Sequence, residues 1–291
     1  MKCNCTKIPK NSNFQTNFFD MKQQELFEQI KIKKSFLCLG LDPDLDKMPS
    51  HLIETSQDPL FDFCKTIVDH VQHLCVAVKI NTAFFEAYGV DGFSSLEKLI
   101  QYIKSHYPDL FTIADAKRGD IGNTSLRYAK AFFEAMPFDS ITIAPYMGKD
   151  SVEPFLTYKN KHAILLALTS NKGASDFQLK TNKKQSLYKE VLTTSQTWEN
   201  AERLMYVVGA TKANHLKEIR ALVPDSFLLV PGVGAQGGSL KEVFENGANQ
   251  HVGLLVNSSR GILYASNGED YTEAALASAA ELQQQMETLL G

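Results

Sequence analysis

Eight short apolar runs, rich in β-branched residues, recur along the 291-residue chain and alternate with segments of helical periodicity. Such alternation is typical of repeated βα units around a parallel sheet. Near-continuous hydrophobicity also indicates strands that are covered on both faces. We expect strands at SFLCLGLD (35–42), CVAVKIN (75–81), LFTIADAK (110–117), SITIAPY (140–146), AILLALT (163–169), RLMYVVGA (203–210), SFLLVPGVG (226–234) and HVGLLVNSS (251–259).

The segments between these runs carry apolar residues at three- and four-residue steps, as amphipathic helices do. Eight strands alternating with helices predict an α/β fold, a single-domain (β/α)8 TIM barrel over residues 22–291. A helix at about 22–33 would precede the first strand, and one at 271–289 would close the ring. The competing doubly wound sheet needs a glycine-rich turn after its first strand, and GLDPDLDKM is not such a turn.

Residues 1–21 form a polar stretch without the continuous apolar segment of a signal peptide or membrane span. We expect a flexible extension, with Met21 as a candidate alternative start. Cys3 and Cys5 would need two more ligands nearby to bind a metal, and none is evident. The cysteine count is five, an odd number, and three of these residues lie in apolar runs, which favours reduced thiols and a cytoplasmic location.

The charge balance gives no sign of a nucleic-acid or membrane partner. The chain mixes 30 basic with 33 acidic residues, for a net charge of -3. Its seven histidines are scattered and show no metal-ligand spacing, so no metal is expected. A small anionic ligand would therefore need a local site.

Polar residues close several of the apolar runs. The active sites of (β/α)8 barrels are built at the carboxyl ends of the strands, so these residues are candidates for chemistry. They are Asp42 after the first run, Lys79 and Asn81 after the second, Asp115 and Lys117 after the third, and Thr169, Ser170 and Asn171 after the fifth.

The loops after the seventh and eighth runs suit a phosphate group. PGVGAQGG (231–238) supplies four glycines, whose backbone N–H groups can approach an anion closely. Arg260 follows the eighth run, where a guanidinium can pair with phosphate oxygens. Glycines also mark tight turns, so the two elements together carry the prediction.

The charges of the third run constrain one another. On a regular strand Asp115 and Lys117 share a face, roughly 6.6–6.8 Å apart. Burying an unpaired carboxylate or ammonium costs several kcal/mol, so Asp115, Lys117 and Lys79 fit a buried strand end if acid and base alternate in space. The alternatives are a structural salt-bridge lattice and a solvated strand end. A phosphate cradle on the same rim favours chemistry.

Taken together, DAKRGDI, the lysine of VAVKIN, PGVGAQGG and NSSRGI resemble the orotidine 5′-phosphate decarboxylase family, in its longer bacterial class. The resemblance covers roughly residues 35–265 and implies decarboxylation of orotidine 5′-monophosphate to uridine 5′-monophosphate without metal or cofactor, the last step of pyrimidine nucleotide synthesis. It also implies a charged network of Lys79, Asp115, Lys117 and Asp120. Lys117 would donate the proton to the carbon that loses carbon dioxide.

The resemblance further implies a homodimer with shared active sites, in which Asp120 and Thr124 serve the partner's substrate. The other substrate-binding residues that it implies are Asp42 for the ribose, Ser170 for the pyrimidine ring, and Gln236, Arg260, Gly234 and Gly261 around the phosphate. Lys172 stands where many members have a proline. Residues 170–195 and 232–238 are the loops expected to close over the ligand.

Two other functions fit parts of the pattern. Magnesium-dependent relatives that resemble 3-keto-gulonate 6-phosphate decarboxylases share the Asp-x-Lys-x-x-Asp motif, but they would want a further acidic ligand, for which Glu86 lies far past Lys79. A non-catalytic barrel that binds uridine nucleotides would need no lysine and aspartate network. Arg118 is expected to be structural, as a partner for acidic neighbours.

Overall fold

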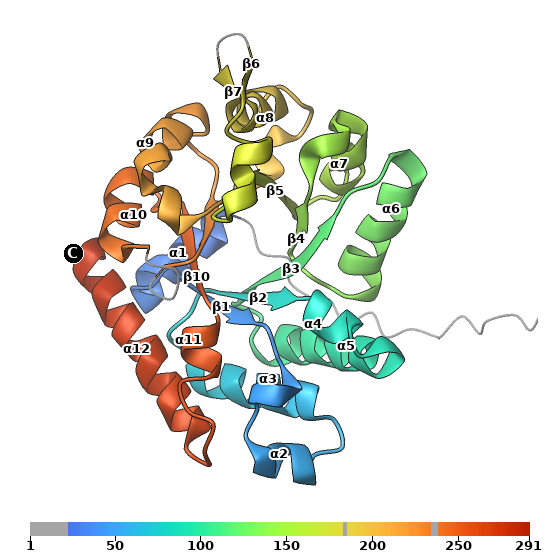
Figure 1. Ribbon diagram of the computed structural model, residues 1–291, viewed down its shortest axis with the longest axis vertical. Helices are drawn as coiled ribbons and strands as arrows, with labels where there is room; N and C mark the ends of the chain where they lie inside the picture. Colours follow the sequence, from blue (N-terminus) through green and yellow to red (C-terminus); the bar gives the residue numbers. More distant parts are fainter. Residues whose placement is uncertain (1–22, 183–184, 234–237) are drawn as a thin grey trace, which may run out of the picture.

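The computed structural model describes residues 23–182, 185–233 and 238–291. Its eight parallel barrel strands close in the order β1-β10-β9-β8-β5-β4-β3-β2 (Figure 1). Each strand overlaps one of the eight predicted runs, so the predicted single-domain TIM barrel is confirmed. The barrel strands are β1 Leu37–Leu41, β2 Ala77–Asn81, β3 Phe111–Arg118, β4 Ser140–Ile143, β5 His162–Leu168, β8 Leu204–Val208, β9 Leu228–Pro231 and β10 Leu254–Ser258.

Helices surround the strands, as Figure 1 shows. The helices expected before the first strand and after the last one are present as α1 and α12. The helices of the described residues are α1 Gln23–Lys33, α2 Ser50–Thr55, α3 Pro59–Val71, α4 Ala83–Glu86, α5 Gly89–His106, α6 Gly122–Lys130, α7 Lys149–Leu156, α8 Leu187–Ser195, α9 Ala213–Leu222, α10 Leu240–Gly247, α11 Arg260–Leu263 and α12 Tyr271–Leu290. The predicted extension over 1–21, with Met21, lies outside the described residues.

Local sequence sets where some helices begin. Asp58 caps α3 by accepting a hydrogen bond from the Phe61 amide at 3.3 Å, and Pro59 occupies the first helical turn, where its missing N–H is not needed. Ser239 caps α10 in the same way through the Glu242 amide. No helix among the described residues is long and apolar enough to span a bilayer.

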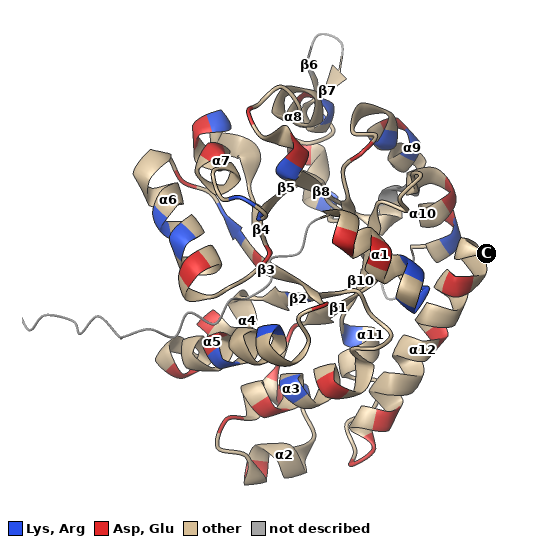
Figure 2. Ribbon diagram, turned by 180° about the vertical axis from the view of Figure 1, so that it is seen from behind, with Lys and Arg blue, Asp and Glu red and all other residues tan. Residues whose placement is uncertain are grey.

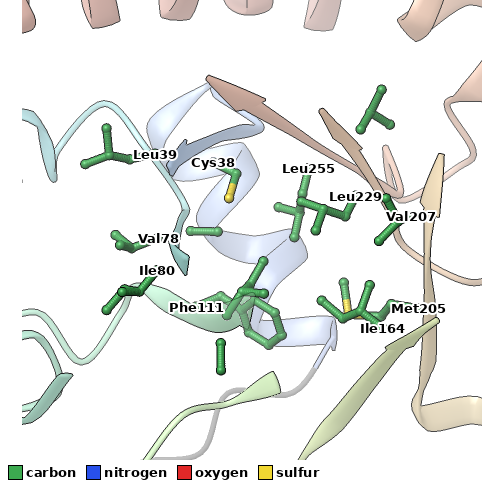
Figure 3. Packing of buried hydrophobic residues seen from close by; sticks show 14 of the residues in the cluster. Cys38, Leu39, Val78, Ile80, Phe111, Ile164, Met205, Val207, Leu229 and Leu255 are labelled. Carbon is green, nitrogen blue, oxygen red and sulfur yellow. The ribbon is translucent and has the colours of Figure 1, made fainter. Parts of the chain in front are cut away.

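Apolar side chains fill the barrel interior. Figure 3 shows Phe111, Ile164, Met205 and Leu255, which come from four different strands, gathered together. All four are fully buried. Because side chains alternate along a strand, the inward row of each strand continues from these residues toward the carboxyl end. There it becomes polar on β3 and β10, with Asp115 and Asn257, and stays apolar on β5 and β8, with Leu166 and Val207.

Helix α1 covers the opposite end of the barrel (Figure 2). The Gln23 side-chain amide donates to the carbonyl of Glu202, just before β8, at 3.1 Å. The Phe27 ring meets the His251 ring, just before β10, with a centroid distance of 4.9 Å. The amino-terminal ends of these strands are therefore closed, and ligands have access from the other end.

The long connection after β5 differs from the expected polar loop over 170–195. It contains a 3-10 helix over Lys172–Asp176, a two-stranded hairpin of β6 (Thr181–Asn182) and β7 (Gln185–Ser186), and helix α8. The sequence analysis did not identify α8, because its apolar face is short and follows a polar stretch. The expected closing segment is thus built partly from regular structure.

A buried ion pair ties α5 to the start of β4. Lys104 and Asp139 have fully buried side chains, and the Lys104 Nζ lies 2.9 and 3.1 Å from the two carboxylate oxygens. Asp139 also accepts hydrogen bonds from the Thr112 amide at 2.8 Å and hydroxyl at 2.7 Å. The pair therefore joins a helix to two adjacent strands.

Substituting one member of this pair should destabilise the fold more than substituting both. Lys104→Met leaves a buried carboxylate without its cation, and we expect it to lower the free energy of unfolding by roughly 3–5 kcal/mol. The double variant Lys104→Met/Asp139→Asn removes both charges and keeps an acceptor for Thr112, so its loss should be smaller. Urea unfolding of the three proteins measures the difference, and equal losses in both variants would contradict the argument.

Candidate active site

A cavity of about 220 Å³ opens at the carboxyl ends of the barrel strands. Its wall combines apolar side chains from β5, β8 and β9 with charged and amide side chains from β1, β2, β3 and β10. The lining includes Asp42, Lys79, Asn81, Asp115, Lys117, Leu166, Val207, Leu229, Asn257, Ser259 and Arg260. Six of the sequence-predicted candidates thus meet at one place, namely Asp42, Lys79, Asn81, Asp115, Lys117 and Arg260.

Asp115 stands between two ammonium groups. The Lys79 Nζ lies 2.9 Å from its Oδ2 and the Lys117 Nζ 2.6 Å from its Oδ1. Lys79 and Asp115 are buried, whereas the Lys117 side chain is 51% exposed. Lys79 also lies 3.6 Å from the Asp42 Oδ1. Acid and base therefore alternate in space, as the cost of burying single charges requires.

These contacts keep both buried groups ionised. Burial by itself raises the pKa of Asp115, but the charges of Lys79 and Lys117 outweigh it and hold that pKa well below the ordinary value. Burial by itself lowers the pKa of Lys79, and the carboxylates of Asp115 and Asp42 outweigh it and raise that pKa above the ordinary value. A carboxylate and an ammonium therefore coexist in the cavity wall at neutral pH.

The end of β3 is not a regular strand. Lys117 has φ +45°, and the pairing of β3 with β4 shifts between Ala114 and Arg118. The simple alternation expected for Asp115 and Lys117 is therefore interrupted, because the bulge turns Lys117 toward the Asp115 carboxylate. Thr142 on β4 donates to the Asp115 Oδ1 at 2.9 Å and accepts from the Lys117 amide at 2.9 Å.

Asp42 is held where the barrel closes. Its Oδ2 accepts a hydrogen bond from the Ser259 hydroxyl at 2.7 Å, and its carbonyl accepts from the Tyr264 hydroxyl at 2.8 Å. The Oδ1 atoms of Asp42 and Asn257 are buried and have no hydrogen-bond partner among the residues that the structure describes. Both residues line the cavity, so these two oxygens can accept hydrogen bonds from donors on a ligand.

The predicted phosphate residues are only partly described. Arg260 begins α11, is exposed, and lines the cavity together with Gly232 and Val233. Gly234 and Gln236 lie outside the described residues. Gly261 lines a neighbouring hollow beside α10 and α12 rather than the cavity itself.

Ser170 is close to the cavity but does not line it. Its buried hydroxyl has no hydrogen-bond partner within the described part of the chain and packs against Gly209, where an added Cβ would lie 2.1 Å from the Ser170 Oγ. The close approach explains why glycine follows β8. Beside it, the Thr169 amide donates to the Gln178 Oε1 at 2.8 Å and holds the connection after β5 against the strand end. Lys172 begins the 3-10 helix of this connection.

Asp120 and Thr124 are not brought into the cavity of their own chain. The Asp120 carboxylate accepts a hydrogen bond from the Ile121 amide at 2.7 Å, and Thr124 is exposed on α6. Large exposed apolar side chains surround this region on α6 and on the neighbouring connection between β4 and α7. They are Ile121 (57% exposed), Leu126 (44%), Tyr146 (87%) and Met147 (42%).

Arg118 does not line the cavity, and its contacts fit the structural role expected for it. Its guanidinium forms an ion pair with Glu86 of α4 and lies 5.5 Å from the ring centroids of Tyr128 and Phe132. Glu86 is thereby engaged away from Lys79. Within the described part of the chain, no three His, Cys, Asp or Glu side chains are grouped as a metal site.

Sequence reasoning missed four residues that shape the site. Thr142 lies inside an apolar run and gave no signal, because threonine is common in strands. Asn257 and Ser259 belong to the NSSRG segment, of which only Arg260 and Gly261 are predicted site residues. Tyr264 lies beyond the last run, and only the fold brings its hydroxyl to Asp42.

Comparisons with known proteins agree with this geometry. The model of the Orotidine 5'-phosphate decarboxylase / HUMPS family matches residues 35–275. Orotidine 5'-phosphate decarboxylase of Flavobacterium johnsoniae is 63% identical over 270 residues, which cover 93% of this chain and 98% of that protein. The Bacteroides fragilis protein of the same name is 57% identical over 91% of this chain and 97% of its own length.

Solved structures show the same likeness. The structure of Leishmania donovani OMP decarboxylase superposes with a TM-score of 0.79 at 32% sequence identity, covering 92% of this chain and 99% of that one. With the family match spanning most of the barrel and close relatives matched almost end to end, the chain belongs to the orotidine 5′-phosphate decarboxylase family of carboxy-lyases.

Proposed function

We propose that the protein converts orotidine 5′-monophosphate to uridine 5′-monophosphate and carbon dioxide in pyrimidine biosynthesis. The observation that carries the proposal is the Lys79–Asp115–Lys117 array in the cavity wall, with Arg260 on the same rim. The names of the curated relatives, which describe this activity, support it.

The array suits a decarboxylation without an electron-accepting cofactor. When the bond to the carboxylate breaks, its electron pair stays on the ring carbon, and a fixed cation beside that carbon stabilises the developing charge. Of the two lysines in the array, Lys117 is the more exposed, and its ammonium then gives its proton to this carbon. The products are uridine 5′-monophosphate, carbon dioxide and a neutral lysine, which solvent reprotonates.

The other charged groups hold the Lys117 ammonium in place. Asp115 contacts the Lys117 Nζ at 2.6 Å, and Lys79 balances the charge of Asp115 from the other side. A substrate carboxylate placed near Asp115 would also be repelled, and this repulsion ends when carbon dioxide leaves. We give this second effect less weight than stabilisation by Lys117.

Residues in the cavity wall and beside it would contact the substrate. Asp42, whose Oδ1 lies 3.6 Å from Lys79 and makes no hydrogen bond to the described residues, would accept hydrogen bonds from the ribose. Ser170, beside the cavity, would meet the pyrimidine ring through its Oγ, which makes no hydrogen bond to the described residues. Arg260 would pair with the phosphate. Gly234, Gln236 and Gly261 would complete the phosphate site.

The partner subunit would complete each site. Asp120 and Thr124 lie outside their own cavity, on a surface with four large exposed apolar side chains. Exposed apolar patches commonly mark protein interfaces. We propose a homodimer in which Asp120 and Thr124 of one subunit reach the substrate of the other.

The cytoplasmic location stays a prediction that cell fractionation would test.

The rival activities find less support. A magnesium-dependent enzyme would need a further carboxylate at the cavity, and Glu86, the candidate, is paired with Arg118 instead. A non-catalytic nucleotide-binding barrel would have no use for two lysines around one buried aspartate. Turnover that requires added magnesium would favour the first rival.

Lys117→Ala should abolish most turnover. We expect a loss of at least about 100-fold in kcat, because the cation beside the reacting carbon and the proton donor are both removed. The loss is measured from the ultraviolet absorbance of orotidine 5′-monophosphate with purified protein. Lys98→Ala, which breaks an exposed ion pair with Asp58, is the matched control and should change kcat less than about twofold. Wild-type-like turnover by Lys117→Ala would remove Lys117 from its role.

Mixing two inactive variants tests the shared site. If Asp120 serves the partner's cavity, then Lys117→Ala and Asp120→Ala subunits can combine into a dimer with one intact site. After unfolding and refolding an equal mixture, about one quarter of the wild-type activity should return, as random pairing in a symmetric dimer predicts. Each variant refolded alone is the control. A mixture as inactive as its components would contradict the shared site.

Arg260→Ala should lower kcat as well as raise KM, because the binding energy of a remote phosphate can be expressed in the rate when loops close. The matched control is orotidine, the substrate without phosphate, on which the same substitution should have little effect. Steady-state kinetics with both substrates separate these cases. A rise in KM alone, with kcat intact, would show that phosphate binding and catalysis are not coupled.

A further inference from the structure

The hydroxyl of Thr142 joins the carboxylate of Asp115 to the backbone amide of Lys117. Thr142 lies on β4 and is 1% exposed. Its Oγ1 donates a hydrogen bond to the Asp115 Oδ1 at 2.9 Å and accepts one from the Lys117 backbone amide at 2.9 Å. A hydroxyl is suited to this place, because one atom offers both a donor and acceptor lone pairs.

The backbone at Lys117 needs such support. Its φ of +45° lies in the left-handed region, which side chains other than glycine rarely adopt. Such a conformation persists when the surrounding structure fixes it. The shift in pairing between Ala114 and Arg118 takes the Lys117 amide out of the regular β3–β4 ladder, and the Thr142 hydroxyl is the acceptor that it finds instead.

The same hydroxyl fixes the carboxylate that Lys117 faces. The Asp115 Oδ1 accepts from the Lys117 Nζ at 2.6 Å and from the Thr142 hydroxyl at 2.9 Å, while Oδ2 accepts from Lys79. The direction of the carboxylate is therefore set by three donors from three strands. Without Thr142, one amide loses its acceptor and one carboxylate oxygen loses a donor.

We propose that Thr142 is a positioning residue of this enzyme, whose hydroxyl holds the Lys117 backbone in the left-handed conformation and thereby places the Lys117 ammonium against Asp115. The inference rests on the proposed function in so far as Lys117 is the proton donor. Thr142 acts on the reaction only through Lys117 and Asp115. Its side chain needs no contact with the substrate.

Two substitutions separate the hydroxyl from the rest of the side chain. Thr142→Val keeps the shape and removes the hydrogen bonds, whereas Thr142→Ser keeps the hydroxyl and removes a methyl group. We expect Thr142→Val to lower kcat on the order of 100-fold, as displacement of a catalytic group does, with KM changed less than about threefold. Thr142→Ser should stay within about threefold of wild-type kcat, because it retains both hydrogen bonds.

The kinetic split distinguishes positioning from a general structural role. A role in packing alone would make Thr142→Ser, which leaves a small void, at least as harmful as Thr142→Val. A role in binding would raise KM and leave kcat intact. Either result, or equal kcat values for the two variants, would overturn the inference.

Crystal structures of the two ligand-free variants test the inference without reference to the reaction. In Thr142→Ser, Lys117 should keep its positive φ and its contact with Asp115. In Thr142→Val, the Lys117 backbone should relax to negative φ and its Nζ should leave the carboxylate. An unchanged Lys117 in Thr142→Val crystals would overturn the role of Thr142 even if the wild type decarboxylates orotidine 5′-monophosphate. A displaced Lys117 would support that role even if the wild type does not.

Discussion

One carboxylate, that of Asp115, is shared by two ammonium groups, and the arrangement of the site depends on this sharing. Lys79 approaches one oxygen and Lys117 the other. The charge of Asp115 keeps the buried Lys79 ionised, and the charges of the two lysines keep Asp115 ionised at its depth. The barrel meets this requirement by placing the three residues on the adjacent strands β2 and β3, where the last residue of β2, Asn81, pairs with Asp115.

The rest of the molecule supplies what such a cluster needs. Apolar side chains from several strands fill the barrel below it, and α1 packs at the far end against the residues just before β8 and β10. The second buried ion pair, Lys104 with Asp139, lies near the beginnings of β3 and β4. Thr112 donates hydrogen bonds to its carboxylate. The chain thus contains two kinds of buried charge. One is fully enclosed and serves the fold, and the other opens to a ligand.

The sequence was informative where local pattern determines structure. All eight barrel strands could be located, since a strand buried on both faces reads as a continuous apolar run, and the polar residues that close the runs led to Asp42, Lys79, Asp115 and Lys117. The bulge at Lys117 could not be predicted, because no residue pattern in DAKRGD indicates a positive φ at the lysine. Helix α8 was missed for a similar reason, since its sequence follows a polar stretch. The contacts of Thr142 and Tyr264 depend on which strands become neighbours.

The seam of the barrel runs through the site. Strand β1 pairs with β10, and the Asp42 carboxylate after β1 is held by the Ser259 hydroxyl after β10, two residues 217 positions apart in the sequence. During synthesis, Asp42 therefore leaves the ribosome long before Ser259, whose hydroxyl orients its carboxylate. Until the last strand has left the exit tunnel, the nascent chain has no complete wall around the substrate, so a nucleotide can stabilise only the finished barrel and cannot assist the folding of its first half.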